Sequence, residues 1–417
     1  MPYFKTYLIL YTLGMALSQL SSAEPTPQPT IEALHWWTTG GEAKALKVIK
    51  DKMAQEGYIW RDSTIREGNG SEQKRVLRAR VEAHTPPDIV QTQYIKQFYR
   101  EGFLDNLDNI AKKDHWETII PKPIQNSVRY QGHWLAVPLN IQRSNWIWAN
   151  KKIFDKLHLK PPKTFNELIE VSEKIKRAGY IPFAHGGQPW QDIIFFDAVL
   201  LSVGGVSLYQ KALIDFDAET LKSPQMVTVF ERTLKLRNFF DSDFVGRDWN
   251  LATAMLIHDK AAMQVMGDWV KGEFNNAHLE SGKDYFCFEY PETFGSFLYS
   301  SDMFSIIKAP QKQRRSQEDL ARIAISKEVQ ETFNLAKGST PVRLDVNMKL
   351  FDECTQQAHT HFMAAMKKNQ VIERFDIIPS LARRNAIFNF IGEFIQKGNL
   401  GAKEAAERFA KIIQSTP

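Results

Sequence analysis

The chain has 417 residues, too many for one compact hydrophobic core, so its length predicts two domains or lobes. With 43% hydrophobic and 24% charged residues it has an ordinary globular composition, which argues against a disordered or fibrous chain. The formal net charge of +5 is spread along the sequence. The only dense basic cluster, KQRR at 312–315, lies in a polar connector and is interpreted as a solvated turn, so no nucleic-acid partner is expected.

The first 23 residues predict a cleavable secretory signal. Lys5 precedes the apolar stretch YLILYTLGMAL, and LSSA supplies the small residues Ser21 and Ala23 that a signal peptidase prefers. A membrane anchor is disfavoured because the apolar run is shorter than the roughly 20 residues that a spanning helix needs, and Pro-rich EPTPQPT follows it. No later segment is judged long and apolar enough to span a bilayer. We therefore expect a soluble, exported protein located in the periplasm.

Strands and helices alternate directly after this segment. The alternating segments are, in chain order, IEALHWW, EAKALKVIKDKMAQEG, YIWRDSTI, SEQKRVLRARVEAH, DIVQTQ and IKQFYREGFL. The first, third and fifth have strand character and the others have helical periodicity. This order is typical of a parallel sheet with helices packed over it, and it predicts an α/β fold.

A further α/β region is predicted after Pro161. KTFNELIEVSEKIKRAGY reads as a helix, with Thr164 and Glu167 three residues apart in a capping-box pattern. AAMQVMGDWV at 261–270 reads as another strand.

The chain has two cysteines, Cys287 and Cys354. An even pair in an exported protein favours a disulfide over two buried thiols. The spacing alone leaves both interpretations open, because closure depends on how close the two Cα atoms lie.

The segment HWWTTGGE at 35–42 has the composition of a ligand site. It stands at a strand end, a glycine turn and a helix start, where ligands bind in open α/β sheets. Trp36 and Trp37 point to opposite sides if both are extended, so one can be core and the other exposed. Glu42 falls near a helix N-terminus and can accept hydroxyl hydrogen bonds. An indole beside such a carboxylate suits a sugar; the alternative is a Trp pair packed in the core.

Several longer segments have unusual local composition. They are NIQRSNWIWANKKIF (140–154), AGYIPFAHGGQPWQD (178–192), GRDWNLATAML (246–256), MQVMGDWVKGEF (263–274), YSSDMF (299–304) and AKGSTPVR (336–343). Together with WWTTGGE and TPPDIVQTQ they closely resemble the glucose-type sugar-binding proteins of ABC transporters, within the family 1 extracellular solute-binding proteins. The resemblance runs from about Leu34 to about Arg384 and fades over 310–330.

This resemblance implies a two-lobed α/β clamp of the type II-like periplasmic class, with mainly parallel sheets, flanking helices and crossing hinge strands. Residues 24–139 plus 304–344 would form the first lobe, and 140–303 plus 345–417 the second. Such a clamp closes on a sugar and delivers it to a membrane permease driven by an ATPase. A monomer is expected, with no cofactor, no metal and no enzymatic activity.

The resemblance also implies the residues that contact the sugar. Carried over position by position, they are Trp36, Trp37, Glu42, Trp269, Asp302 and Lys337. Three of them have structural alternatives: Trp269 in the core, Asp302 as a cap for the following turn, and Lys337 as a surface lysine.

Two positions depart from the pattern of glucose-type proteins. Gln93 stands where they carry a Lys, and SLARRNA places Arg383 where they carry a sugar-contacting His. A guanidinium differs from an imidazole in charge and donor geometry, so we hypothesise a different or modified hexose, with an anionic group that Arg383 clamps. The alternative is that Arg383 points to solvent and the alignment shifts by a residue or two.

Other functional classes have less support. In an exported glycosidase Glu42 and Asp302 would be acid and nucleophile, but neither lies in a recognisable catalytic motif. An enzyme with a serine nucleophile is disfavoured because no GxSxG elbow is present. The pair His359 and His361 lacks other ligands at zinc-like spacing and is interpreted as surface polarity. A binding module that feeds a chemoreceptor would use the same clamp, and the sequence does not separate it from transport.

Overall fold

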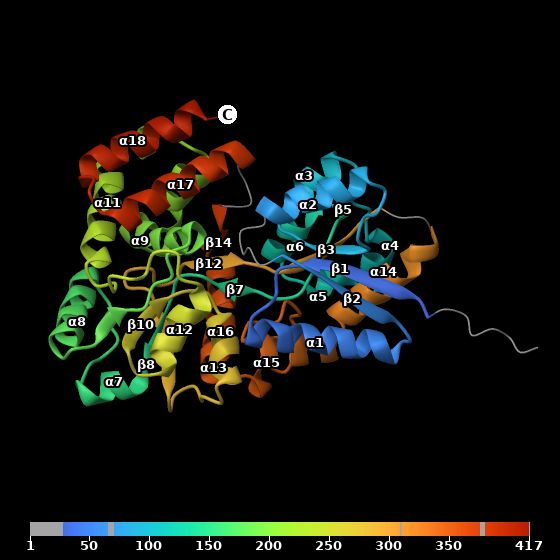
Figure 1. The fold of residues 1–417 in the computed structure, drawn as a ribbon, viewed down its shortest axis with the longest axis horizontal. Helices are drawn as coiled ribbons and strands as arrows, with labels where there is room; N and C mark the ends of the chain where they lie inside the picture. Colours follow the sequence, from blue (N-terminus) through green and yellow to red (C-terminus); the bar gives the residue numbers. More distant parts are fainter. Residues whose placement is uncertain (1–27, 66–70, 309–310, 376–379, 417) are drawn as a thin grey trace, which may run out of the picture.

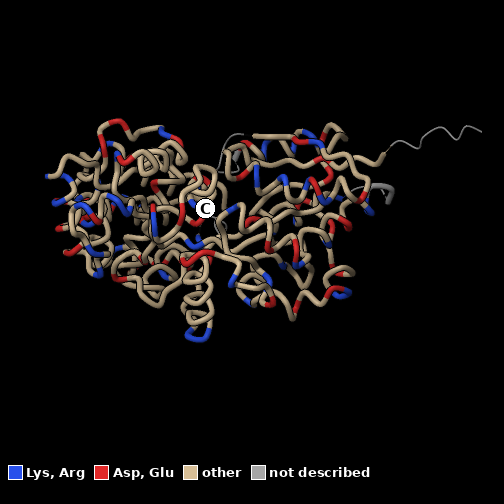
Figure 2. The backbone as a smooth tube through the Cα atoms, turned by 90° about the horizontal axis from the view of Figure 1, so that it is seen from below, with Lys and Arg blue, Asp and Glu red and all other residues tan. Residues whose placement is uncertain are grey.

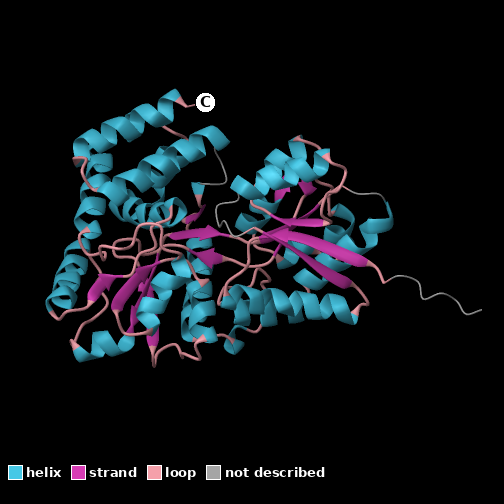
Figure 3. Cartoon of the chain, in the orientation of Figure 1, coloured by secondary structure: helices cyan, strands magenta, loops and turns pink. Residues whose placement is uncertain are grey.

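The computed structural model describes residues 28–65, 71–308, 311–375 and 380–416, which form two α/β lobes (Figures 1 and 3). The predicted signal, residues 1–23, lies outside the described residues. Two hydrophobic clusters form the cores; Leu34, Val90 and Phe304 belong to one, Ile147 and Met263 to the other. Acidic and basic residues are interspersed along the backbone of both lobes (Figure 2).

The predicted strand–helix alternation is confirmed at the start of the described chain. The elements are β1 (Thr30–His35), α1 (Gly40–Gln55), β2 (Ile59–Thr64), α2 (Ser71–Glu82), β3 (Ile89–Gln91) and α3 (Ile95–Arg100). Strand β1 pairs in parallel with both β2 and β3. The edge of β3 is then covered by a strand from much later in the chain, β13 (Met303–Ile306), which runs antiparallel and also pairs with β6 (Val137–Pro138). The sheet order is β2-β1-β3-β13-β6.

Short helices and a hairpin complete this lobe. They are α4 (Asp108–Lys113), α5 (Trp116–Ile119), α6 (Lys122–Val128), and the pair β4 (Arg129–Tyr130) and β5 (His133–Trp134). Helices α14 (Gln311–Ile325) and α15 (Lys327–Lys337) pack on α1. The prediction of a turn at KQRR is wrong: these residues begin α14, where Arg314 pairs with Asp105 at 3.0 Å and with Glu318 one turn on at 2.9 Å.

The second lobe is built on a four-stranded sheet of order β11-β8-β10-β9. Its strands are β8 (Trp146–Asn150), β9 (Ile181–Phe183), β10 (Ala261–Val265) and β11 (Tyr285–Glu289). Strand β8 is antiparallel to both neighbours, and only β9 and β10 are parallel, so the expectation of mainly parallel sheets is wrong for this sheet. The strand predicted at 261–270 ends at Val265, because the chain turns at MGDW before the next helix.

Helices surround this sheet. They are α7 (Lys151–Lys156), α8 (Phe165–Arg177), α10 (Ala218–Leu221), α11 (Pro224–Arg237), α12 (Trp249–Ile257), α13 (Val270–Asn276), the 3-10 turn η2 (Met348–Leu350), α16 (Glu353–Lys367), α17 (Leu381–Lys397) and α18 (Ala402–Ser415). The predicted capping box is confirmed: Thr164 accepts from the Glu167 N–H at 3.2 Å, and the Glu167 carboxylate accepts from the Thr164 N–H.

Helix α9 (Pro189–Tyr209) and the π-turn η1 (Gln210–Ile214) contradict the expectation that no later segment matches a membrane span in length and composition. In the 18-residue apolar window of this segment, 72% of the residues are buried inside the protein, and α9 packs against α11 and α17. It is also broken by Gly205, whose φ of 62° is left-handed. Its apolar character is therefore that of a core helix.

A three-stranded sheet of order β14-β12-β7 lies between the two larger sheets (Figure 1). Its strands are β7 (Gln142–Arg143), β12 (Phe297–Ser300) and β14 (Val371–Glu373). Strand β7 connects β6 of the first sheet to β8 of the second, and β12 leads from the second sheet to β13 of the first. Strand β14 pairs with β12. We propose that these strands form the hinge, and that the lobes are 24–139 plus 304–344 and 140–303 plus 345–417.

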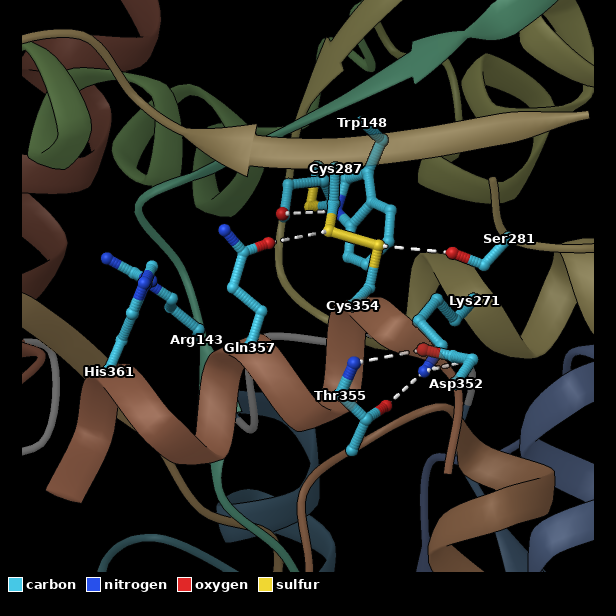
Figure 4. The surroundings of a disulfide bond; sticks show 11 residues. Arg143, Trp148, Lys271, Ser281, Cys287, Asp352, Cys354, Thr355, Gln357 and His361 are labelled. Carbon is cyan, nitrogen blue, oxygen red and sulfur yellow. Dashed lines mark hydrogen bonds and ion pairs between the residues drawn. A yellow bond between two sulfur atoms is a disulfide. The ribbon is translucent and has the colours of Figure 1, made fainter. Parts of the chain in front are cut away.

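A disulfide joins Cys287 of β11 to Cys354 in the first turn of α16, with the Cα atoms 6.0 Å apart (Figure 4). The pairing that the even cysteine count favours is therefore present, and it fixes the start of α16 to the four-stranded sheet.

The interpretation of His361 as surface polarity is wrong, because the residue is half-buried beside the hinge. Its Nδ1 lies 2.9 Å from Nη1 of Arg143, a fully buried residue of β7 whose Nη2 donates to Glu289 at 2.6 Å (Figure 4 shows the two side chains). Burial, followed by the Arg143 charge, lowers the pKa of His361. Arg143 also lies over the ring of Trp146, so the cluster ties β7 to the second lobe.

Candidate functional site

A cavity of about 260 Å³ is lined by residues from both lobes. Its volume lies just below the roughly 300–1,000 Å³ of typical small-molecule sites. Hydroxyl and amide side chains contribute to the wall alongside rings and charged groups. These polar residues are Thr38, Thr39, Gln93, Gln142, Gln188, Asn250 and Ser300.

Five aromatic side chains line the cavity. They are Trp36 and Tyr94 from the first lobe, and Trp190, Trp249 and Trp269 from the second. The rings of Trp190 and Trp269 lie 6.3 Å apart and form one continuous aromatic wall. Trp269 keeps only 9% of its surface exposed, and it lies just before the first residue of α13. Several flat apolar faces in a cavity that also has polar walls are surfaces against which the C–H faces of a sugar ring can pack.

Glu42 and Lys337 form an ion pair in the cavity wall. Lys337 Nζ donates to Glu42 Oε1 at 3.0 Å, and both side chains are buried. Glu42 stands in the first turn of α1 and Lys337 is the last residue of α15, so each charge is favoured by its helix dipole. The pair leaves Glu42 Oε2 and further Lys337 N–H groups for a ligand, because an ammonium has three donors and a carboxylate has two oxygens.

The Asp302 carboxylate is held in place by two amides. Gln91 Nε2 donates to one oxygen at 3.1 Å and Asn140 Nδ2 to the other at 2.9 Å. Gln91 Oε1 accepts from the Trp36 N–H at 3.1 Å, which links this carboxylate to the HWWTTGGE segment. Asp302 is therefore a fixed acceptor in the wall and not the turn cap of the alternative interpretation.

The amino group of Lys74 lies behind Tyr94 at one side of the cavity. Lys74 of α2 is buried, and its Nζ lies 3.0 Å from the centroid of the Tyr94 ring. Burial, followed by the charges of Arg384 and Arg78, lowers the pKa of Lys74 to about 7. Arg384 of α17 lies 5.7 Å from the same ring and lines the cavity, as does Gln93.

Two residues predicted in the site do not line it. Trp37 is 2% exposed and packs against Phe304 and Phe333 with ring centroids 5.6 and 5.5 Å apart, so the core interpretation holds for this member of the pair. Arg383 turns away: its Nη2 donates to the Thr416 carbonyl at 2.6 Å. On a helix the next residue is rotated by about 100°, which brings Arg384 to the cavity instead.

Six of the eight predicted ligand residues are thus brought together in one cavity. They are Trp36, Glu42, Gln93, Trp269, Asp302 and Lys337. The prediction missed the remaining charged and aromatic lining residues: Tyr94, Trp190, Asp248, Trp249, Arg374 and Arg384. The segments GQPWQD and GRDWN contain Trp190, Asp248 and Trp249, so the unusual composition of these segments was the available signal.

Asp268, next to Trp269, is fully buried, and its carboxylate accepts from the Arg143 N–H at 2.9 Å. Burial raises the pKa of Asp268 from 3.8 to about 7, against the partial opposition of the Arg143 N–H and of the Lys271 and Arg143 charges. The carboxyl group therefore holds its proton more tightly in the folded chain than in the unfolded one.

The pH dependence of stability should change in Asp268→Asn. As the pH rises from 3.8 to about 7, wild type loses the stability that the tighter proton binding supplies, whereas the amide does not titrate. The free energy of unfolding of wild type should therefore fall relative to the variant across this window. Denaturant titrations of both proteins at several pH values between about 4 and 8 measure the difference. If the free energy of unfolding changed with pH in the same way in both proteins, the result would contradict the raised pKa of Asp268.

Two α/β lobes that enclose a small cavity of indoles and paired charges define a binding protein, and the sequence comparison assigns its family. The chain belongs to the bacterial extracellular solute-binding proteins, whose family model matches residues 61–306. A probable sugar-binding periplasmic protein of Rhizobium meliloti (strain 1021) is 43% identical over 408 residues, 97% of this chain and 98% of that protein. A protein of the same description from Brucella suis biovar 1 is 41% identical over 397 residues, 94% of each chain.

The fold is also that of solved binding proteins. The bacterial solute receptor AcbH, described as having an exclusive preference for β-D-galactopyranose, superposes with a TM-score of 0.79 at 16% identity, over 92% of this chain and 97% of that one. This likeness confirms the predicted two-lobed fold class.

Proposed function

We propose that this protein is the periplasmic solute-binding component of an ABC sugar importer. It captures a glucose-like monosaccharide or small oligosaccharide and delivers it to a membrane permease powered by an ATPase. The observation that carries the proposal is the cavity itself, in which three indoles of one lobe face an indole and a preformed Glu42–Lys337 pair of the other. The names of the relatives from Rhizobium and Brucella support the same class of ligand.

Binding follows from the shape of the site. The indoles take the apolar faces of the ring, while Glu42 and Asp302 accept from hydroxyl groups and Lys337 donates to them. Because residues of both lobes contribute, only a closed arrangement makes all contacts at once, and ligand shifts the population toward it. A micromolar dissociation constant corresponds to about −8 kcal/mol, which a few hydrogen bonds and stacking can supply.

Isothermal titration of the purified protein against glucose, mannose, galactose, disaccharides and sugar acids tests this function. The expected result is saturable binding of at least one neutral sugar at micromolar concentration. Sugar acids stay in the panel because Arg384 and Arg374 line the cavity. Failure of every sugar to bind would overturn the proposal.

The rival functions need separate measurements. Release of monosaccharide from disaccharides during incubation would support a glycosidase, with Glu42 and Asp302 as its carboxyl pair. Capture of a chemoreceptor, rather than a permease, by the sugar-loaded protein would support the sensory role. We propose that the working form is a monomer, which sedimentation checks.

A further inference from the structure

Helix α13 (Val270–Asn276) bridges the two lobes at the edge of the cavity. It follows β10 of the four-stranded sheet and begins directly after Trp269. It packs against α1 and α15, which belong to the five-stranded lobe (Figure 1). Each of the three helices carries or adjoins a cavity residue: Glu42 in α1, Lys337 in α15 and Trp269 before α13.

The three elements meet through glycine backbone. A Cβ on Gly41 would lie 2.5 Å from the carbonyl carbon of Gly272, which is closer than real Cβ atoms come to backbone. A Cβ on Gly272 would in turn lie 3.1 Å from the Lys337 carbonyl oxygen and 3.3 Å from the Gly41 Cα. The absence of side chains therefore sets how closely α1, α13 and α15 approach one another.

Polar side chains of α13 form hydrogen bonds with backbone groups at the start of α1 and in the last turn of α15. Thr39, the residue before α1, makes no capping hydrogen bond with its side chain. The Gly41 N–H instead donates to Glu273 Oε1 at 3.1 Å, so a carboxylate from the opposite lobe stands at the positive end of the α1 dipole. Asn275 Nδ2 donates at 3.1 Å to the carbonyl of Leu335, in the last turn of α15.

The opposite side of α13 is fixed to its own lobe. Lys271 Nζ lies 2.5 Å from Asp352 and also donates to Thr355, both at the start of α16 (Figure 4). The Cys287–Cys354 disulfide joins the same turn of α16 to β11. Helix α13 therefore moves with the four-stranded sheet, and its contact with α1 reports the separation of the lobes.

We propose that Gly272 and Glu273 are positioning residues for ligand binding. Docking of α13 on the glycine turn of α1 fixes the separation of the lobes at which Glu42, Lys337 and Trp269 reach one ligand. Neither residue lines the cavity, so their effect on affinity is exerted through the position of α1 relative to α13. The affinity part of this inference rests on the proposed sugar-binding function.

Two substitutions test the contact. Gly41→Ala places a methyl group against the Gly272 backbone, and Glu273→Gln keeps the shape of the side chain but removes its charge. We expect Gly41→Ala to weaken binding of the best sugar in the panel by about tenfold or more, since apparent affinity falls with the fraction of molecules able to close. Glu273→Gln should weaken it about two- to fivefold, as expected for loss of one charge–dipole contact.

Matched controls separate this effect from general damage. Gly401→Ala also adds a methyl group at a helix start, where nothing lies within 4 Å, and Glu280→Gln removes an exposed carboxylate shortly after α13. Both should bind like wild type. Thermal unfolding of all four variants shows whether each one folds; if Gly41→Ala does not fold, Glu273→Gln decides.

Small-angle scattering of the sugar-free proteins gives a readout that needs no ligand. The proposal has α13 docked on α1 in part of the sugar-free population as well, so the radius of gyration should increase in Gly41→Ala, whose methyl group excludes that arrangement, and stay unchanged in Gly401→Ala. Unchanged scattering and unchanged affinity in Gly41→Ala would overturn the inference. If wild type binds no sugar, the proposed function fails, while the scattering still tests the interlobe contact.

Discussion

Replacing Lys337 by methionine should lower the free energy of unfolding by about 3 kcal/mol, because it leaves the Glu42 carboxylate unpaired in a largely buried position. The effect is placed at the lower end of the range for broken buried pairs because Glu42 faces the cavity, where water reaches it. Loss of a charged donor should also weaken sugar binding by roughly 10- to 100-fold. Denaturant unfolding and isothermal titration measure the two effects.

The double variant Glu42→Gln/Lys337→Met is the matched control for stability. It removes both charges, so it should recover most of the stability lost in Lys337→Met while still binding sugar weakly. Equal stabilities of wild type and Lys337→Met would contradict the importance of the pair.

Replacing Trp269 by alanine should produce the largest loss of affinity. Truncating a central aromatic anchor of a binding site costs about 2–4 kcal/mol, which corresponds to a dissociation constant roughly 30 to 1,000 times higher. Trp269 meets this description because it lines the cavity with only 9% of its surface exposed and forms one wall with Trp190.

Two further substitutions interpret the Trp269 result. Trp269→Phe keeps a flat apolar face and should recover part of the affinity. Trp37 packs in the core next to Trp36. Trp37→Phe should therefore lower the free energy of unfolding while leaving the affinity for sugar near that of wild type. A Trp269→Ala variant that binds as tightly as wild type would exclude this indole from the ligand contacts.

Much of the fold could be predicted from local patterns. The alternation of strand and helix over residues 30–100 is dictated by hydrophobic period and by glycine stops, and it reappears in the structure. The membership of β13 in the first sheet is different, since its partners β3 and β6 are distant in sequence. Only the family resemblance indicated that the chain returns there.

The limits of prediction in the site have a physical origin. An extended backbone predicted opposite directions for Trp36 and Trp37; β1 ends before them, at His35, and the structure buries Trp37 while Trp36 lines the cavity. Near Arg383 no such periodic signal distinguishes two successive arginines, because the choice depends on how α17 is rotated against the rest of the lobe. The pairing of Lys337 with Glu42 is also a tertiary contact, invisible in the separate segments that carry the two residues.

The late arrival of β13 has a consequence for how the protein is made. Strand β3 ends at Gln91, but its antiparallel partner begins at Met303. At translation rates of about 5–20 residues per second, roughly 10–40 s separate the synthesis of these two strands. Throughout that interval the edge of β3 lacks the strand that covers it in the native sheet, and such edges invite pairing with other chains. Although it has two lobes, the molecule cannot complete the first before most of the second has been synthesised.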